Sequence, residues 1–131
     1  MNTQAMHAVM AETQAGQLIF PEVVRRLLEV GVESYFCDAA AMRETLYLRD
    51  GQIHTAKMTL SHHAIAEDFS KAGIAAAVRG AQSDTIRYPE FMKQSAAAGV
   101  IAYWAFLTGR QVIYFGRKGE MHIEKFPDAK P

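Results

Sequence analysis

The chain lacks the features that mark secreted, membrane-spanning or strongly basic proteins. Its 131 residues include a single cysteine, which excludes an internal disulfide framework. Fourteen basic residues balance fourteen acidic ones, and this neutrality argues against a protein that holds nucleic acid or an anionic membrane through a broad basic surface. No apolar run approaches the roughly 18 residues that a membrane-spanning helix needs. The first residues show no basic start before an apolar run, so we expect no secretory signal and a cytoplasmic location.

Sequence motifs of catalysis and metal binding are also missing. We find no Gly-rich phosphate loop, no Ser-His-Asp order and no paired acidic motif. His54, His62 and His63 are close in sequence, but their spacing matches no familiar zinc signature, and adjacent histidines point apart on a helix. The sequence therefore favours a protein that is not an enzyme, and it predicts no metal and no cofactor.

The composition is nevertheless suited to a folded domain. Half of the residues are hydrophobic and 21% are charged, which is enough to build a packed core. The length fits one compact domain. A chain without net charge has little repulsion between its copies, so we expect it to be poorly soluble as a bare monomer.

The chain contains an internal repeat. Shifting the sequence by 68 residues aligns Phe20-Pro21-Glu22 with Tyr88-Pro89-Glu90 and needs no gap over residues 20–57. Nine of these 38 positions are identical, where chance would give about two or three. Both copies open with a proline and an acidic residue, which suit a first helical turn, and both then reach a glycine, Gly31 or Gly99, which suits a helix C-cap. We infer an ancient duplication.

Each copy predicts two helices followed by three strands. Apolar residues at helical spacing indicate helices over residues 3–15, 20–30, roughly 61–81, and 88–98. β-Branched and aromatic residues bounded by turns predict the strands Val32–Asp38, Arg43–Arg49, Gln52–Met58, Val100–Leu107, Gln111–Phe115 and Glu120–Phe126. The expected fold is α+β, an internally duplicated helix-helix-three-strand unit with about six mostly antiparallel strands and helices packed on the sheet. Residues 1–131 would form a single domain made of two repeats, roughly 1–60 and 61–127.

The residues also resemble a known family. The stretch that begins Tyr88-Pro89-Glu90-Phe91-Met92 and ends Gly99-Val100 is similar to the YdfO/YbcV-like family, and so is the ending from Ile113-Tyr114-Phe115 to Lys125-Phe126-Pro127. Members are small uncharacterised proteins of bacteria and their prophages, sometimes labelled "phage envelope protein". The resemblance extends over nearly the whole chain. It implies a small α+β domain without an established activity, so it supplies no catalytic or binding residues.

Four residues that the two copies share are candidate ligand-binding residues. His54 and His122 occupy matched places in the third strand of each copy, on the face opposite the apolar one, and Arg49 and Arg117 precede them by five residues. If the copies pack about a pseudo-twofold axis, these side chains could line a shared groove that holds a small anion, a carboxylate or a phosphate. The alternative, which the sequence favours, is that they form solvent-facing cross-strand pairs.

The strands of the second copy carry aromatic residues on both faces. Tyr103 alternates with Trp104, and Ile113 with Tyr114, so neither face is cleanly polar. An exposed aromatic face indicates a partner, whereas a long helix or a terminus that wraps the second face would explain the pattern equally well. We predict a non-enzymatic interaction module that forms a homodimer, without membrane or nucleic-acid partners. Its candidate interface residues are Tyr103, Trp104, Phe106 and Tyr114.

Overall fold

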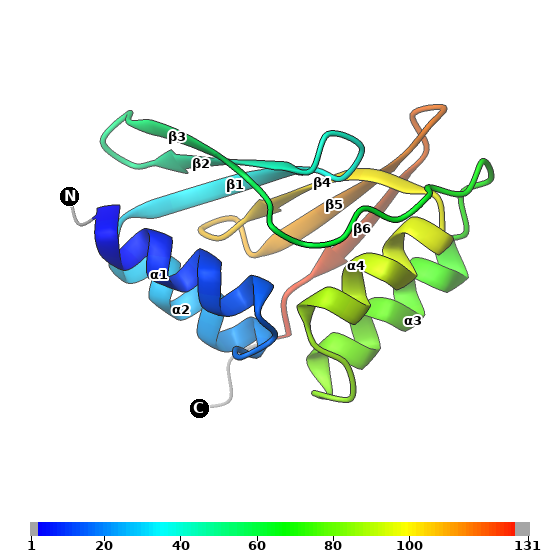
Figure 1. Cartoon of the computed structure of the whole chain (residues 1–131), viewed down its shortest axis with the longest axis horizontal. Coiled ribbons are helices and arrows are strands. Elements are labelled where there is room, and N and C mark those ends of the chain that lie inside the picture. Colours follow the sequence, from blue (N-terminus) through cyan, green and yellow to red (C-terminus); the bar gives the residue numbers. More distant parts are fainter. Residues whose placement is uncertain (1–2, 128–131) are drawn as a thin grey trace.

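A six-stranded antiparallel sheet carries helices on one of its faces (Figure 1). The computed structural model describes residues 3–127. Its elements in chain order are α1 (Thr3–Gln14), α2 (Phe20–Glu29), β1 (Val32–Asp38), β2 (Arg43–Leu48), β3 (Ile53–Lys57), α3 (Lys71–Gln82), α4 (Tyr88–Ala97), β4 (Val100–Phe106), β5 (Gln111–Gly116) and β6 (Met121–Lys125). The strand order is β3-β2-β1-β4-β5-β6, which confirms the predicted α+β class.

The duplication in the sequence is repeated in the backbone. Each of the five elements from α1 to β3 begins and ends 68 residues before its counterpart from α3 to β6. The residues with positive φ also form matched pairs at this offset: Gly16 with Asp84, Gly31 with Gly99, Met42 with Arg110, and Gly51 with Gly119. Where β1 meets β4, Phe36 pairs with Trp104, its own counterpart. A pseudo-twofold axis therefore passes through the sheet between these two residues.

Helices α2 and α4 begin and end for the same local reasons. Pro21 and Pro89 stand in their first turns, where a missing N–H costs no helical hydrogen bond. The Glu22 carboxylate accepts a hydrogen bond from the backbone N–H of Ile19 at 3.2 Å, which caps the start of α2. Gly31 and Gly99 then take left-handed backbone angles, with φ of 93° and 82°, and turn the chain into β1 and β4.

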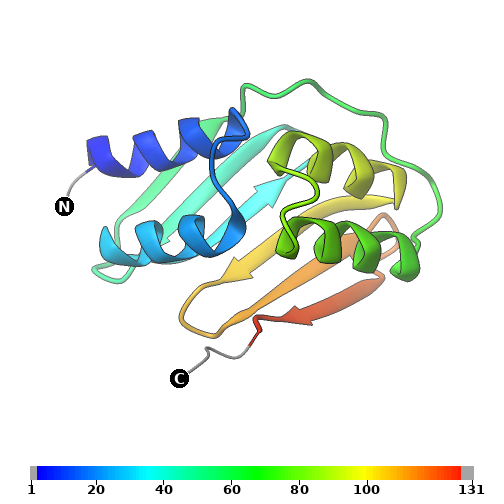
Figure 2. The same cartoon turned by 90° about the horizontal axis from the view of Figure 1, so that it is seen from below.

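The hydrophobic core lies between the helices and one face of the sheet. In Figure 2, which looks onto the helices, α1 with α2 and α3 with α4 form two pairs in front of the strands. The helices contribute buried side chains such as Met6, Val23, Leu27, Ile74 and Phe91. The strands contribute inward-facing residues that are also buried, among them Tyr35, Cys37, Leu46, Tyr103, Ala105, Val112 and Tyr114.

The helix expected over residues 61–81 is too long, because the structure begins α3 at Lys71. Residues 58–70 have no regular structure and carry the chain from the edge strand β3 to the helices over the second half of the sheet. The backbone N–H of Ser70 donates to the Ala98 carbonyl at 2.8 Å, and the Ser70 hydroxyl accepts from the N–H of Gly73, which starts the helix there. Thirteen helical residues would span about 20 Å, whereas the extended chain reaches about 40 Å. The crossing therefore favours extended chain.

Candidate functional site

The second face of the sheet is covered by none of the described helices (Figure 1). We call it the open face. The pairing of the strands places its side chains in three rows. In strand order the rows are Ile53, Tyr47, Ser34, Phe106, Gln111, Lys125; then Thr55, Thr45, Phe36, Trp104, Ile113, Ile123; then Lys57, Arg43, Asp38, Ala102, Phe115, Met121.

Aromatic side chains gather at the centre of the open face. Trp104 packs edge-on against Phe36 with ring centroids 5.2 Å apart. Tyr47 and Phe106 stack on the same indole at 5.6 Å and 5.3 Å. This packing covers the indole Nε1, which has no hydrogen-bond partner. Contacts between the four aromatic rings therefore hold the cluster together.

The apolar surface continues from this cluster to both edges of the sheet. Ile53 on β3 is 61% exposed, and Met121 and Ile123 on β6 are 50% and 48% exposed. Together with the central residues they make a diagonal apolar band, which consists of Ile53, Tyr47, Phe36, Trp104, Phe106, Ile113, Phe115, Met121 and Ile123. Charged side chains stand at the two remaining corners, with Arg43 and Lys57 at one and Lys125 at the other. A continuous apolar surface of this kind indicates a partner.

The structure divides the four predicted interface residues between the two faces. Trp104 and Phe106 lie on the open face, in the middle of the apolar band. Tyr103 and Tyr114 are 3% and 5% exposed and lie in the core beneath the helices. The band contains further residues that sequence reasoning did not select, of which Ile53 and Met121 are matched repeat positions. The sequence did carry a signal for these two residues. Each directly precedes a histidine, His54 or His122, and neighbouring residues in a strand face opposite sides of the sheet.

The four predicted ligand-binding residues do not come together. His54 lies on β3 and His122 on β6, which are opposite edges of the sheet. Arg49 follows β2 and Arg117 follows β5, and these turns lie at opposite ends of the sheet because β1 and β4 are antiparallel. A shared groove lined by all four is therefore incompatible with the strand order. Arg117 instead donates a hydrogen bond to the Ile65 carbonyl at 2.9 Å, which holds the segment that precedes α3.

The histidines also face the helix side of the sheet rather than solvent. His54 pairs with the buried Leu46, and His122 pairs with the buried Tyr114. The histidines do lie opposite their apolar strand neighbours, but those neighbours are the residues that face solvent: Ile53 and Ile123 are 61% and 48% exposed. The inward positions His54, Ala56 and His122 of the edge strands are only partly buried, and a polar side chain is tolerated there.

Comparison with known protein families places the chain in one of them. A family model described as a protein of unknown function (DUF1398) matches residues 7–125. The chain belongs to this family. No curated protein matches it. Because the DUF1398 description assigns no activity, the function must be argued from the open face and from the groups in the interior.

The interior of this DUF1398 protein holds two carboxylates. Glu124 accepts from His122 at 2.7 Å and from Arg79 at 3.0 Å; burial acts to raise its pKa, but these two hydrogen bonds lower it overall. Glu44 on β2 is 7% exposed, and burial raises its pKa to about 7. Burial also raises the pKa of the Cys37 thiol, so this cysteine is an unreactive part of the core.

The described part of the DUF1398 fold offers neither a metal site nor a membrane-spanning helix. Among residues 3–127, no group of three or more His, Cys, Asp or Glu side chains is placed to hold a metal ion. No helix in the described part of the chain is both long and apolar enough to cross a bilayer. The open face differs from the solvated face of an ordinary antiparallel sheet in the exposed apolar residues that it carries, among them Ile53, Met121 and Ile123.

Proposed function

We propose that this DUF1398 protein is a non-enzymatic interaction module that forms a homodimer by packing its open face against the same face of a second copy. The observation that carries the proposal is the apolar band, which runs across all six strands without a covering helix. Removing apolar surface of this extent from water lowers the free energy and therefore favours association. A cytoplasmic location and kinship with the YdfO/YbcV-like prophage proteins belong to the same proposal.

The size of the open face supports a stable dimer. Six strands spaced about 4.8 Å apart make a face about 24 Å wide, and strands of this length are about 20 Å long. When two such faces pack together, they would remove on the order of 1,000 Å² of surface from water. The side chains protrude from the sheet, so the area actually buried is larger than this flat estimate. That area reaches the lower limit for specific protein interfaces. Two sheets that pack face to face lie about 10 Å apart, and large side chains such as Trp104 and Phe106 fill that space.

A second copy is favoured over a charged partner by the balance of charges. The chain has no net charge, so two copies approach without long-range repulsion. The apolar band itself contains no charged side chain from Ile53 to Ile123, and the basic residues Arg43, Lys57 and Lys125 stand at the corners of the open face, where they can stay hydrated at the rim of a symmetric contact.

The test is the oligomeric state of the purified protein and of one variant. We expect a dimer in sedimentation velocity from about 1 to 100 µM, a range that brackets ordinary dimer affinities. Ile123→Lys places an ammonium in the band at an exposed edge position, where the fold of the monomer tolerates it. Because a buried unpaired charge is costly, it should raise the dimer dissociation constant at least about tenfold.

Ala76→Lys provides the matched control. Ala76 is an exposed residue of α3, on the opposite side of the molecule from the band, so the same added charge there should leave the dimer unchanged. A wild-type protein that stays monomeric at the highest concentration would refute the proposal. So would equal weakening by the two lysine variants, since the effect would then come from net charge and not from the open face.

A further inference from the structure

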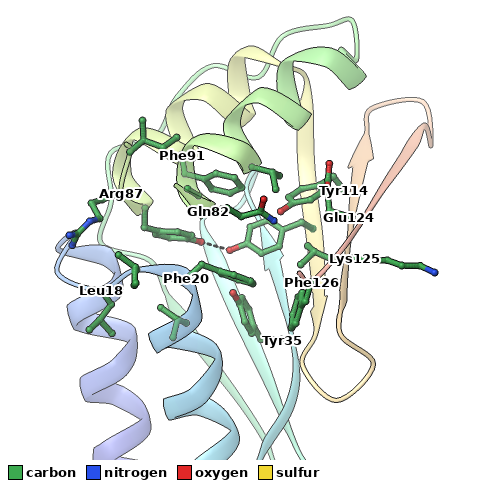
Figure 3. Close-up of a pocket in the computed structure, with 18 residues that line it drawn as sticks. Leu18, Phe20, Tyr35, Gln82, Arg87, Phe91, Tyr114, Glu124, Lys125 and Phe126 are labelled. Carbon is green, nitrogen blue, oxygen red and sulfur yellow. Dashed lines mark hydrogen bonds between the residues drawn. The ribbon is translucent and has the colours of Figure 1, made fainter. Parts of the chain in front are cut away.

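A cleft opens on the helix side of the sheet, away from the open face (Figure 3). Its volume is about 70 Å³. Three tyrosines of the sheet, Tyr35, Tyr103 and Tyr114, line it from β1, β4 and β5, and helices α2 and α4 contribute Phe20 and Phe91. Seven of the eighteen lining residues are aromatic, and they come from distant parts of the sequence.

These rings hold one another in fixed orientations. Tyr103 lies 5.6 Å from Tyr114 and 6.3 Å from Phe91, measured between ring centroids. At the rim, Phe20 meets Phe126 edge-on at 5.3 Å. Aromatic pairs prefer such offset and edge-to-face contacts, so the geometry suits the insertion of one more planar ring.

The charged residues that line the cleft, Arg87, Glu124 and Lys125, either point away from it or are already paired. Arg87 points away in Figure 3 and is bound to the Asp84 carboxylate and to the Gly16 carbonyl. Lys125 also extends away from the cleft. The Glu124 carboxylate is already paired with Arg79 and His122. An ionic ligand would lose its hydration without gaining a partner, so the cleft favours a neutral molecule.

The repeat shows which polar group in the cleft lacks its counterpart's partners. Gln82 corresponds to Gln14, whose side-chain oxygen accepts from the Thr59 N–H and hydroxyl at 2.6 Å and 2.8 Å, and whose amide donates to Glu44 at 3.5 Å. At the matched places of the second half stand Val112 instead of Glu44, and Pro127, which has no N–H, instead of Thr59. Gln82 lines the cleft, and its side-chain oxygen accepts one hydrogen bond, at 3.3 Å, from the guanidinium of the neighbouring Arg79.

We propose that this cleft binds a small neutral aromatic alcohol, whose ring packs among the tyrosines and whose hydroxyl pairs with the Gln82 amide. The hydroxyl takes the part that Thr59 and Glu44 play for Gln14 in the first half. The size of the cleft limits the ligand to a single ring, since an enclosed cavity of about 150 Å³ is needed to hold benzene completely. At about 70 Å³ the cleft admits the ring in part, and its open mouth accommodates the remainder.

Phenol is the probe for this proposal, and benzoate is its charged counterpart. Titration of the full chain, followed by two-dimensional NMR of the backbone amides, should give saturable shifts around Gln82, Tyr103 and Tyr114 with phenol. Benzoate should bind at least about tenfold more weakly because its carboxylate finds no cation in the cleft. Trp104 lies on the open face and is the sole tryptophan, so its indole signal reports any binding there instead.

Three variants on helix α3 test whether phenol binds in the cleft. Ala81→Phe places a ring at the cleft wall and should weaken phenol binding at least about tenfold, whereas Ala76→Phe on the exposed side of the helix should change it less than about twofold. Gln82→Leu should weaken phenol but leave toluene, which has no hydroxyl, unchanged. The proposal is overturned if phenol shows no saturable binding up to about 10 mM, if shifts concentrate on Trp104, or if Ala81→Phe binds as the wild type does. Equal affinity for benzoate also overturns it.

Discussion

Among single residues, Glu44 is a buried carboxylate of the core whose charged form is poorly stabilised. Its carboxylate accepts one long hydrogen bond, 3.5 Å from the Gln14 amide. The groups that interact with it from the neighbouring strands and from α4 are the Cys37 thiol and the hydroxyls of Tyr35, Tyr88 and Tyr103. None of these described neighbours is a cation, so burial alone raises the pKa of Glu44 to about 7.

Glu44 should therefore make stability fall as pH rises. Its pKa is about 7 in the folded protein against 4.5 for the free group, so the folded state binds the proton more tightly. The stabilisation is complete below pH 4.5 and is lost by about pH 7, a change of about 3 kcal/mol in the free energy of unfolding. Glu44→Gln keeps the hydrogen bond but cannot ionise, and should remove this slope. Urea unfolding at several pH values measures it.

The comparison variant is Glu33→Gln, which changes an exposed glutamate on β1. It should retain the wild-type dependence of stability on pH, because it leaves the buried carboxylate of Glu44 in place. If Glu44→Gln also retained that dependence, the buried carboxylate would not be its source.

Among the elements, the segment before α3 is held against the start of β4 at Gly99. Gly99 has a φ of +82°, and a Cβ added to it would lie 2.3 Å from the carbonyl oxygen of Asp68. Gly51 has a similar φ of +94° but has no atom within 4 Å of such a Cβ. The two glycines thus share the same backbone conformation but differ in their surroundings.

Alanine substitutions at these glycines should differ in their cost. Gly51→Ala pays for the left-handed backbone alone, about 1 kcal/mol. Gly99→Ala must also displace residues 68–69, and we expect it to lower the free energy of unfolding by at least about 3 kcal/mol. Chemical denaturation of both variants gives the comparison. Equal losses would mean that the segment yields freely and does not tie the two halves together.

Most elements of this fold were predictable from the sequence, and the exception has a physical reason. The six strands agree with their predicted ranges to within one or two residues, because turns and alternating apolar residues are local signals. Residues 61–70 keep helical spacing through Ile65 and Phe69, yet they form no helix. What decides their conformation is the length that the chain must cross and the backbone bonds to Ala96 and Ala98, which are distant in sequence.

At the scale of the whole molecule, the sequence could predict an aromatic sheet but not which face the helices cover. Both faces of β4 and β5 carry apolar residues, so their pattern alone leaves the direction of Tyr103 and Trp104 open. The edge strand β6 misleads, because His122 and Glu124 turn inward and Ile123 turns outward. Ion pairing with Arg79, a residue of α3, makes the inward position of Glu124 tolerable.

The symmetry of the sheet leads to a prediction about its halves. The pairing of β1 with β4 is centred on Phe36 and Trp104, which are counterparts, so a second copy of β4 could replace β1 with the same register. We expect residues 61–127, expressed alone, to form a folded dimer about the size of the whole chain, since one half has too small a core to fold by itself. Light scattering and circular dichroism measure this. Ala105→Pro removes a backbone N–H that faces the seam between β1 and β4 and should abolish the dimer, whereas a folded monomeric half would show that the two units do not depend on their shared sheet.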